Sequence, residues 1–182
     1  MASAAIETHN YDIFLFGDKI GEMHISKEVK PDGTELYIID SYSKAKVLWI
    51  NRDNTSHYET VYKNGQFFSS GYTEIENGKK TRWGMVKWDG KKYLVDNYAG
   101  KKIINEISKH TVVSLYFGDI SKMKRIFYDS EAEMIDVEHP DANTVEFKSS
   151  DGHRNTYHFV NGVLDRLEVH TSFATAKMVR VN

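Results

Sequence analysis

The residues best suited to proton transfer in this chain are His158 and Asp165. A two-residue turn at Asn161-Gly162 predicts that they lie opposite one another on neighbouring antiparallel strands. A carboxylate beside an imidazole orients the ring and raises its pKa, so the pair is a candidate acid–base element of a hydrolase or isomerase. The alternative is a satisfied polar pair inside a core, and no nucleophile motif accompanies it.

A second pair of histidines, His153 and His170, is predicted to face across two strands. Two imidazoles could hold a metal, but zinc sites in proteins use three or four protein ligands, and the sequence contains no Cys. No third ligand follows from the register. We therefore predict no metal centre and no cofactor.

A third arrangement places His57 in one cross-strand row with Tyr72, Trp83 and Asp96, with Glu59 beside it. If this row opened into a cleft, Glu59 and Asp96 could act as paired carboxylates. The other interpretation, which we favour, is a polar rim beside an aromatic binding surface.

Other common chemistries have no signature here. The sequence has no nucleophile elbow, phosphate-binding loop, dinucleotide fingerprint or zinc-protease motif. The net charge of −2 gives no electrostatic reason to expect a nucleic-acid partner. No apolar run approaches the ~20 residues that a membrane-spanning helix requires, so we expect no transmembrane segment.

The elements that would position these residues are strands joined by tight turns. Asn-Gly or Asp-Gly pairs recur at positions 64–65, 77–78, 89–90, 151–152 and 161–162, between segments rich in aromatic and β-branched residues. Such pairs supply the positive φ angles of type I′ hairpin turns. The chain is therefore predicted to be an antiparallel meander.

This pattern predicts one all-β domain over residues 9–182, preceded by a flexible remnant at 1–8. An N-terminal meander (9–98) and a C-terminal meander (123–182) flank a connecting segment (99–122). We expect a strongly curved sheet, or an open or closed barrel of β-clam type. A short helix or covering segment near 108–118, centred on Val112 to Phe117, is expected to lie against it.

The expected registers gather aromatic side chains on one face of the N-terminal meander, around two glycines that lack side chains. A curved sheet with such a concave face could enclose a ligand. The candidate ligand-binding residues are Tyr58, Tyr62, Phe67, Gly71, Gly84, Trp88 and Tyr93.

The segment from Tyr11 to Gly21 (YDIFLFGDKIG) resembles a motif of uncharacterised exported bacterial proteins with a domain of unknown function. In that motif an aromatic strand leads into Gly-x-x-Ile-Gly and a second strand. The segments 125–128 (RIFY) and 176–181 (AKMVRV) are also consistent with this motif. The resemblance implies a β-rich envelope protein, distantly similar to β-clam and half-barrel periplasmic carriers, and supplies no catalytic residues.

Together these observations predict a noncatalytic protein that is periplasmic or otherwise exported. It would bind a hydrophobic or amphipathic small molecule, or act as an interaction module. The Ala-x-Ala pattern at Ala2 to Ala4 is typical of signal-peptidase sites, although a flexible small-residue terminus has the same composition. Two alternatives stay open: a β-barrel hydrolase or isomerase using a His–carboxylate pair, and a structural protein that self-associates into homo-oligomers through its sheet edges.

Overall fold

The computed structural model describes residues 5–47, 50–118, 123–150 and 152–181, and its architecture is all-β. Its long strands come from the turn-punctuated, β-branched and aromatic segments of the sequence. The first eight strands are β1 (Ala5–Leu15), β2 (Asp18–Val29), β3 (Thr34–Val47), β4 (Ile50–Lys63), β5 (Gln66–Glu76), β6 (Lys79–Trp88), β7 (Tyr93–Asn97) and β8 (Gly100–Ile104). A 3-10 helix, η1 (Val112–Tyr116), follows, and the remaining strands are β9 (Arg125–Tyr128), β10 (Glu133–Asp136), β11 (Glu138–Asp141), β12 (Thr144–Lys148), β13 (Arg154–Val160), β14 (Val163–His170) and β15 (Thr175–Val181).

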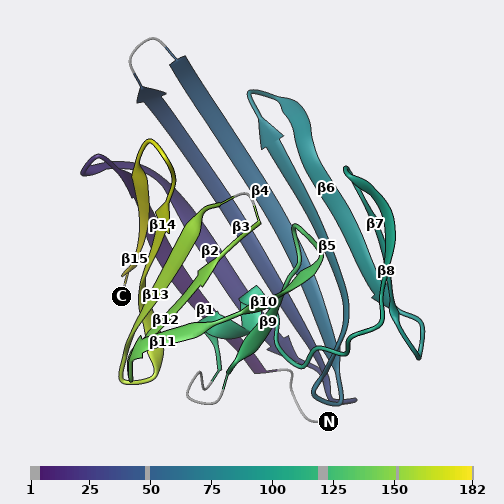
Figure 1. Ribbon diagram of the computed structural model, residues 1–182. Helices are drawn as coiled ribbons and strands as arrows, with labels where there is room; N and C mark the ends of the chain where they lie inside the picture. The colour runs from purple at the N-terminus through teal and green to yellow at the C-terminus, as the bar shows by residue number, and fades with distance from the viewer. Residues whose placement is uncertain (1–4, 48–49, 119–122, 151, 182) are drawn as a thin grey trace.

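Thirteen of these strands form one curved antiparallel sheet (Figure 1), in the order β11-β12-β13-β14-β15-β1-β2-β3-β4-β5-β6-β7-β8. The last strand, β15, therefore lies between β14 and β1 and joins the two halves of the sheet. Within the described residues, β8 and β11 each have one neighbour in this sheet and form its two edges. The expected all-β, strongly curved meander is confirmed.

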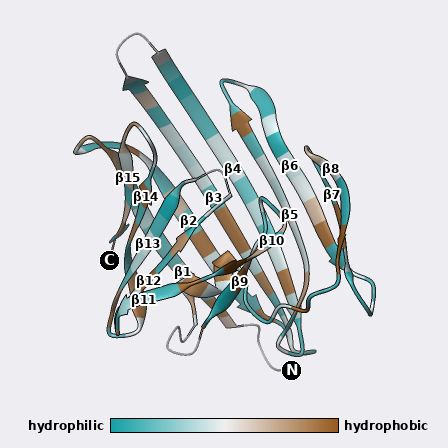
Figure 2. Cartoon of the chain, viewed as in Figure 1, coloured by the Kyte–Doolittle hydropathy of each residue, from teal (hydrophilic) through white to brown (hydrophobic). Residues whose placement is uncertain are grey.

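The concave side of the sheet is covered by η1 and by a separate two-stranded sheet of β9 and β10. Val113, Leu115 and Tyr116 of η1 are buried, as are Ile126 and Phe127 of β9. Apolar residues of the cover and of the sheet's inner face make two adjoining core clusters. In Figure 2, brown residues gather around this covering region, whereas the far ends of β3 and β4 are mostly teal. The covering segment expected near Val112 to Phe117 is thus confirmed.

Three of the predicted hairpin turns are confirmed, because Asn64, Asn77 and Asn161 each adopt a positive φ near 50° and are followed by a glycine with positive φ. The predicted two-residue turn at residues 89–90 is wrong, because Trp88 pairs with Tyr93 and the connection is longer. Within the described residues, however, the strand registers shift at five places. In three of them Ile20, Phe68 and Asp165 are the extra residues, on β2, β5 and β14. Because side chains alternate with period two, each extra residue reverses the faces expected beyond it.

Three boundaries differ from the sequence-based expectation. Residues 5–8, expected to be flexible, belong to β1 and pair with β2, while residues 1–4 lie outside the described part. The connecting segment 99–122 contains strand β8, which the sequence analysis did not predict. Residues 125–136, expected within the C-terminal meander, instead form the small β9–β10 sheet, and a turn at residues 129–132 joins its two strands. In the parts of the chain that the structure covers, no helix has the length and apolar character needed to cross a bilayer.

Candidate functional site

A cavity of about 210 Å³ lies between the concave face of the sheet and its cover. Strand alternation aims Met23 of β2 and Ile39 of β3 into it from one side. Leu167 of β14 and Met178 of β15 line the opposite side, and Val113 of η1 comes from the cover. These side chains make a largely apolar wall.

Four tyrosines lie together on the cavity wall: Tyr58 of β4, Tyr116 of η1, Tyr128 of β9 and Tyr157 of β13. Burial raises the pKa of Tyr157 well above its usual value, and the neighbouring hydroxyls of Tyr116, Tyr128 and Tyr58 raise that pKa further. Burial likewise raises the pKa values of Tyr116 and Tyr58. The phenols of Tyr58, Tyr116 and Tyr157 therefore stay protonated at neutral pH and can take part in hydrogen bonds.

The acidic group of the cavity is Asp129, at the start of the β9–β10 turn. Its side chain is 6% exposed, and its Oδ2 accepts a hydrogen bond from the Thr60 hydroxyl at 3.4 Å. Its Oδ1 has no hydrogen-bond partner within the described residues. Burial raises the pKa of Asp129 to about 7, although the nearby hydroxyls of Ser70 and Thr60 offset part of this rise. Asp129 can therefore exchange a proton near neutral pH.

Across the cavity from the sheet's first half stands Asn155 of β13, which is also 6% exposed. Its Nδ2 has no hydrogen-bond partner among the residues described. Buried polar atoms in folded proteins are nearly always paired, and unpaired ones mark strain or a missing partner. Two residues of the cavity wall thus each carry a buried polar atom without a partner among the described residues.

The residues expected to bind a ligand lie mostly beside this cavity and not in it. Tyr62, Phe67 and Tyr93 do share the concave face, but they are buried in a core cluster with Trp88 and Phe127. The aromatic face is therefore mainly a packing surface for the cover. Of the expected set, Tyr58 alone is among the lining residues that the structure describes.

The two glycines of that set are offset from the expected pairing. Gly71 pairs with Met85, and Gly84 pairs with Tyr72, one residue away from the expected Gly71–Gly84 pair. A Cβ at Gly84 would lie 2.4 Å from Cε1 of Tyr72, so this glycine makes room for the tyrosine ring. A Cβ at Gly71 would meet no atom closer than 3.9 Å.

The expected pairing of His158 with Asp165 is wrong. His158 pairs with Arg166, because Asp165 is the extra residue of the bulge between β13 and β14. Asp165 is exposed at that position, while His158 is half-buried.

The row expected around His57 is also divided. His57 pairs with Thr73, not with Tyr72, and its Nδ1 lies 2.7 Å from Oδ1 of Asp40. Glu59 and Asp96 do fall in one row, but β5 and β6 separate their strands. At about 4.8 Å per strand this places their backbones roughly 14 Å apart, too far for paired carboxylates on a glycosidic bond.

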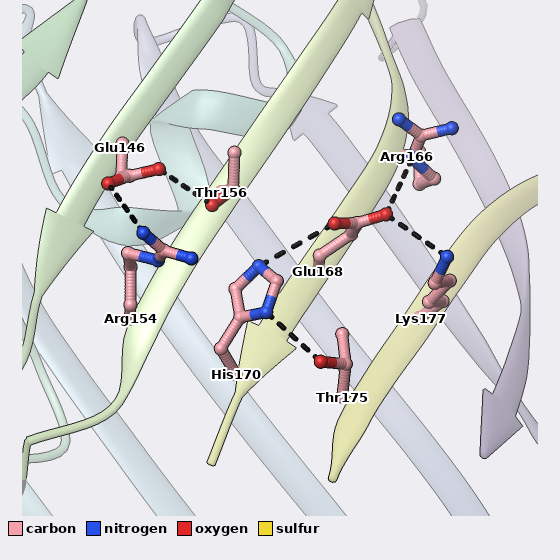
Figure 3. Close-up of polar contacts among 8 residues, drawn as sticks. All are labelled: Glu146, Arg154, Thr156, Arg166, Glu168, His170, Thr175 and Lys177. Carbon is pink, nitrogen blue, oxygen red and sulfur yellow. Dashed lines mark hydrogen bonds and ion pairs between the residues drawn. The ribbon is translucent and has the colours of Figure 1, made fainter. Parts of the chain in front are cut away.

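His170 belongs to a polar network on the outer face of β12–β15, which Figure 3 shows. Its Nδ1 lies 3.0 Å from the Thr175 hydroxyl, and its Nε2 lies 3.5 Å from Oε2 of Glu168. Arg154, and not His153 as expected, is its cross-strand partner. Within the described residues, no three His, Cys, Asp or Glu side chains are grouped closely enough to hold a metal.

Sequence reasoning missed Asp129, Asn155, Tyr116, Tyr128 and Tyr157. A signal for Asp129 was present, since Asp129-Ser130 follows the apolar run Ile126 to Tyr128. That pattern is equally typical of an exposed hairpin turn, and only the packing of the cover against the sheet shows that this turn is buried. A two-residue turn at Asp151-Gly152 would place Asn155 and Tyr157 on the outer face of the sheet, but Lys148 pairs with Arg154, so the connection before β13 is longer and the two side chains face the cavity.

Comparisons with known proteins fit this architecture. A crystal structure of a β-barrel-like protein of domain of unknown function DUF1849 from Brucella abortus superposes with a TM-score of 0.62 at 12% sequence identity. The similarity covers 96% of this chain and 95% of that chain and shows a shared fold. No curated protein matches the sequence. The family model for the domain of unknown function DUF6134 matches residues 11–181, and the chain belongs to that family.

Proposed function

We propose that the protein binds a small amphipathic molecule in the interior cavity and performs no chemistry on it. The observation that supports this proposal is the division of the cavity wall into an apolar part and a polar part. The apolar part contains Met23, Ile39 and Leu167. The polar part contains Asp129 and Asn155, each of which carries an unpaired polar atom. A ligand with one apolar and one hydrogen-bonding end matches this division of the wall.

The size of the cavity limits the ligand. Pockets for drug-sized molecules are roughly 300–1,000 Å³, and this cavity has about 210 Å³. The ligand is therefore a small molecule, or the end of a larger one that enters between the cover and the sheet.

The location that we propose is the cell envelope. The Ala-x-Ala pattern at Ala2 to Ala4 supports it. Fractionation of the native host, with detection of the protein in the envelope or in the cytoplasm, tests this part separately.

The binding proposal is tested by native mass spectrometry of the protein purified from its own host, followed by denaturing extraction. A retained small molecule of defined mass is expected. The variant Val169→Phe, which enlarges a half-buried side chain on the cavity wall, should release it. The matched control Val181→Phe, at an exposed position of β15, should retain it. Equal retention by both variants would place the ligand elsewhere.

A second candidate function is self-association through the outer face of β6–β8. Met85, Leu94 and Ile103 are 59%, 44% and 55% exposed and line one shallow hollow with Lys87 and Lys101. Residues 79–109 contain nine Lys and Arg but three Asp and Glu, in a chain of net charge −2. A basic, partly apolar face at a free sheet edge is complementary to the acidic remainder of a second copy.

Sedimentation velocity tests the second candidate. Oligomers that increase with protein concentration and decrease with salt are expected if the face associates. Ile103→Glu should abolish them, whereas Ile6→Glu, at an exposed position of β1, should not. A monomer at all concentrations would exclude this candidate.

A further inference from the structure

We infer that the ligand of the interior cavity is an amphipathic amine whose ammonium group pairs with Asp129. This inference rests on the proposed function and specifies its ligand class. If the ligand is such an amine, fatty acids, phosphates and other anionic amphipaths should not bind in this cavity.

The first support is the charge of the wall. Asp129 is the one side chain among the described lining residues that carries a charge at physiological pH, and Lys, Arg and His are absent from that lining. A buried carboxylate without a cationic neighbour is costly, and an anionic ligand beside it would add repulsion. A cationic ligand instead supplies the missing counter-charge.

The second support is the hydrogen-bonding geometry at Asp129. Its Oδ1 is unpaired within the described chain, and its side chain is 94% shielded from solvent, being 6% exposed. An ammonium group has three N–H donors and no acceptor. One N–H can bond to Oδ1, and the phenol oxygens of Tyr58, Tyr128 and Tyr157 on the same wall can accept the others.

The third support is the aromatic surroundings. Rings of tyrosine attract cations through their faces, and clusters of such rings recognise ammonium ligands. Tyr116 packs edge-on against Tyr157 with ring centroids 6.2 Å apart, and Tyr58 stacks on Tyr72 at 5.5 Å. The hydrocarbon part of the amine would then lie against Met23 and the other apolar residues of the wall.

The titratable side chains nearest to Asp129 are phenols that carry no charge at neutral pH. The phenols of Tyr62 on β4 and Tyr72 on β5 lie near enough to interact electrostatically with Asp129, and burial keeps both neutral by raising their pKa values. In the adjoining turn, Glu131 accepts a hydrogen bond from the backbone N–H of Ser150. An amine with a pKa near that of lysine, about 10.4, stays cationic from pH 5 to 9. Amine binding should therefore strengthen with pH as Asp129 ionises, and binding below about pH 7 should release the proton of Asp129.

Isothermal titration calorimetry with three probes of one chain length tests the inference: hexylammonium chloride, 1-hexanol and sodium hexanoate. At pH 8 hexylammonium should bind at least about tenfold more tightly than 1-hexanol, and hexanoate should not bind. At pH 5.5, where Asp129 is protonated, the preference for the amine over the alcohol should fall about tenfold. This pH comparison uses the wild-type protein, so it tests the inference even if substitution of Asp129 prevents folding.

Asp129→Asn should bind 1-hexanol as the wild type does and lose its preference for the amine. The matched control Asp18→Asn, at an exposed carboxylate at the start of β2, should behave like the wild type. If 1-hexanol or hexanoate binds the wild type at pH 8 as tightly as hexylammonium, the amine inference is wrong and the cavity remains a binding site. If no probe binds and no molecule is retained on purification, the proposed function itself is wrong.

Discussion

The hydroxyl of Tyr62 on β4 lies 2.9 Å from the hydroxyl of Thr111, and it also accepts a hydrogen bond of 2.9 Å from the Thr111 backbone N–H. All these groups are buried. One tyrosine of the sheet thus holds the residue directly before the 3-10 helix, and with it the cover of the cavity. A side chain that the sequence assigned to ligand contact instead joins the two walls of the site.

Tyr62→Phe should therefore destabilise the protein. The substitution keeps the ring but leaves the Thr111 N–H and hydroxyl buried without their partner, which costs about 1–3 kcal/mol of unfolding free energy. Urea denaturation measures this difference. Tyr42→Phe, at a position 48% exposed, should change stability by less than about 0.5 kcal/mol. Equal effects of the two substitutions would contradict the tethering role of Tyr62.

Asp129 should make the stability depend on pH. Its pKa is about 7 in the folded protein and 3.8 without the fold, so between these values the folded state holds a proton that the unfolded state has released. The free energy of unfolding must then fall as pH rises from about 4 to 7, by a few kcal/mol in total.

Asp129→Asn removes this titration. Its stability relative to the wild type should increase with pH across the same range and level off above about pH 7. Denaturation at pH 4, 5.5, 7 and 8 measures the difference. A wild-type-to-variant difference that is constant with pH would show that Asp129 is not desolvated.

The two glycines of the curved sheet should respond differently to alanine. At Gly84 the added Cβ would meet the Tyr72 ring at 2.4 Å and Cβ of Asn97 at 2.9 Å, so Gly84→Ala should cost about 1–3 kcal/mol. At Gly71 the nearest atom is 3.9 Å away, so Gly71→Ala should be neutral or stabilise the protein by up to about 1 kcal/mol. Thermal melting of both variants measures the difference in stability. Similar losses of stability in the two variants would refute this prediction.

The outer network should contribute modestly and in a salt-dependent way. Oε1 of Glu168 lies 3.2 Å from Nε of Arg166 and 3.4 Å from Nζ of Lys177 (Figure 3). Glu168→Gln should therefore cost about 1 kcal/mol in low salt and less in 1 M NaCl, because ions screen partly exposed pairs. Glu138→Gln, on the exposed edge strand β11, is the control and should have no measurable effect in either salt. A loss at Glu168 that is independent of salt would indicate packing and not charge.

The sequence was sufficient to predict most strands, three of the tight turns and the covering segment, because local turn chemistry determines them. Asn64-Gly65 and Asn161-Gly162 each make the expected tight turn. The side-chain faces could not be predicted beyond the bulges. Asp165 follows an ordinary hairpin signal, and nothing in its neighbours shows that it is the residue without a cross-strand partner.

The candidate site depended on contacts that are distant in sequence. Thr60 and Asp129 are 69 positions apart, and their contact exists because the cover folds back onto the sheet. An aspartate before a serine after an apolar strand has the same local pattern whether its turn is exposed or buried. The burial of Asp129, which underlies its raised pKa, is therefore a property of the tertiary structure alone.

The position of β15 determines the order in which this sheet can be completed. β15 pairs with β14 on one side and with β1 on the other, and its pairing with β1 brings Asn10 opposite Val181. Until β15 is synthesised, the eight strands β1–β8 and the four strands β11–β14 are separate pieces with unpaired edges. Pairings between residues so distant in sequence form slowly, and until they form the unpaired strand edges are prone to aggregation. The cavity, whose walls come from both pieces, can therefore form only at the end of folding.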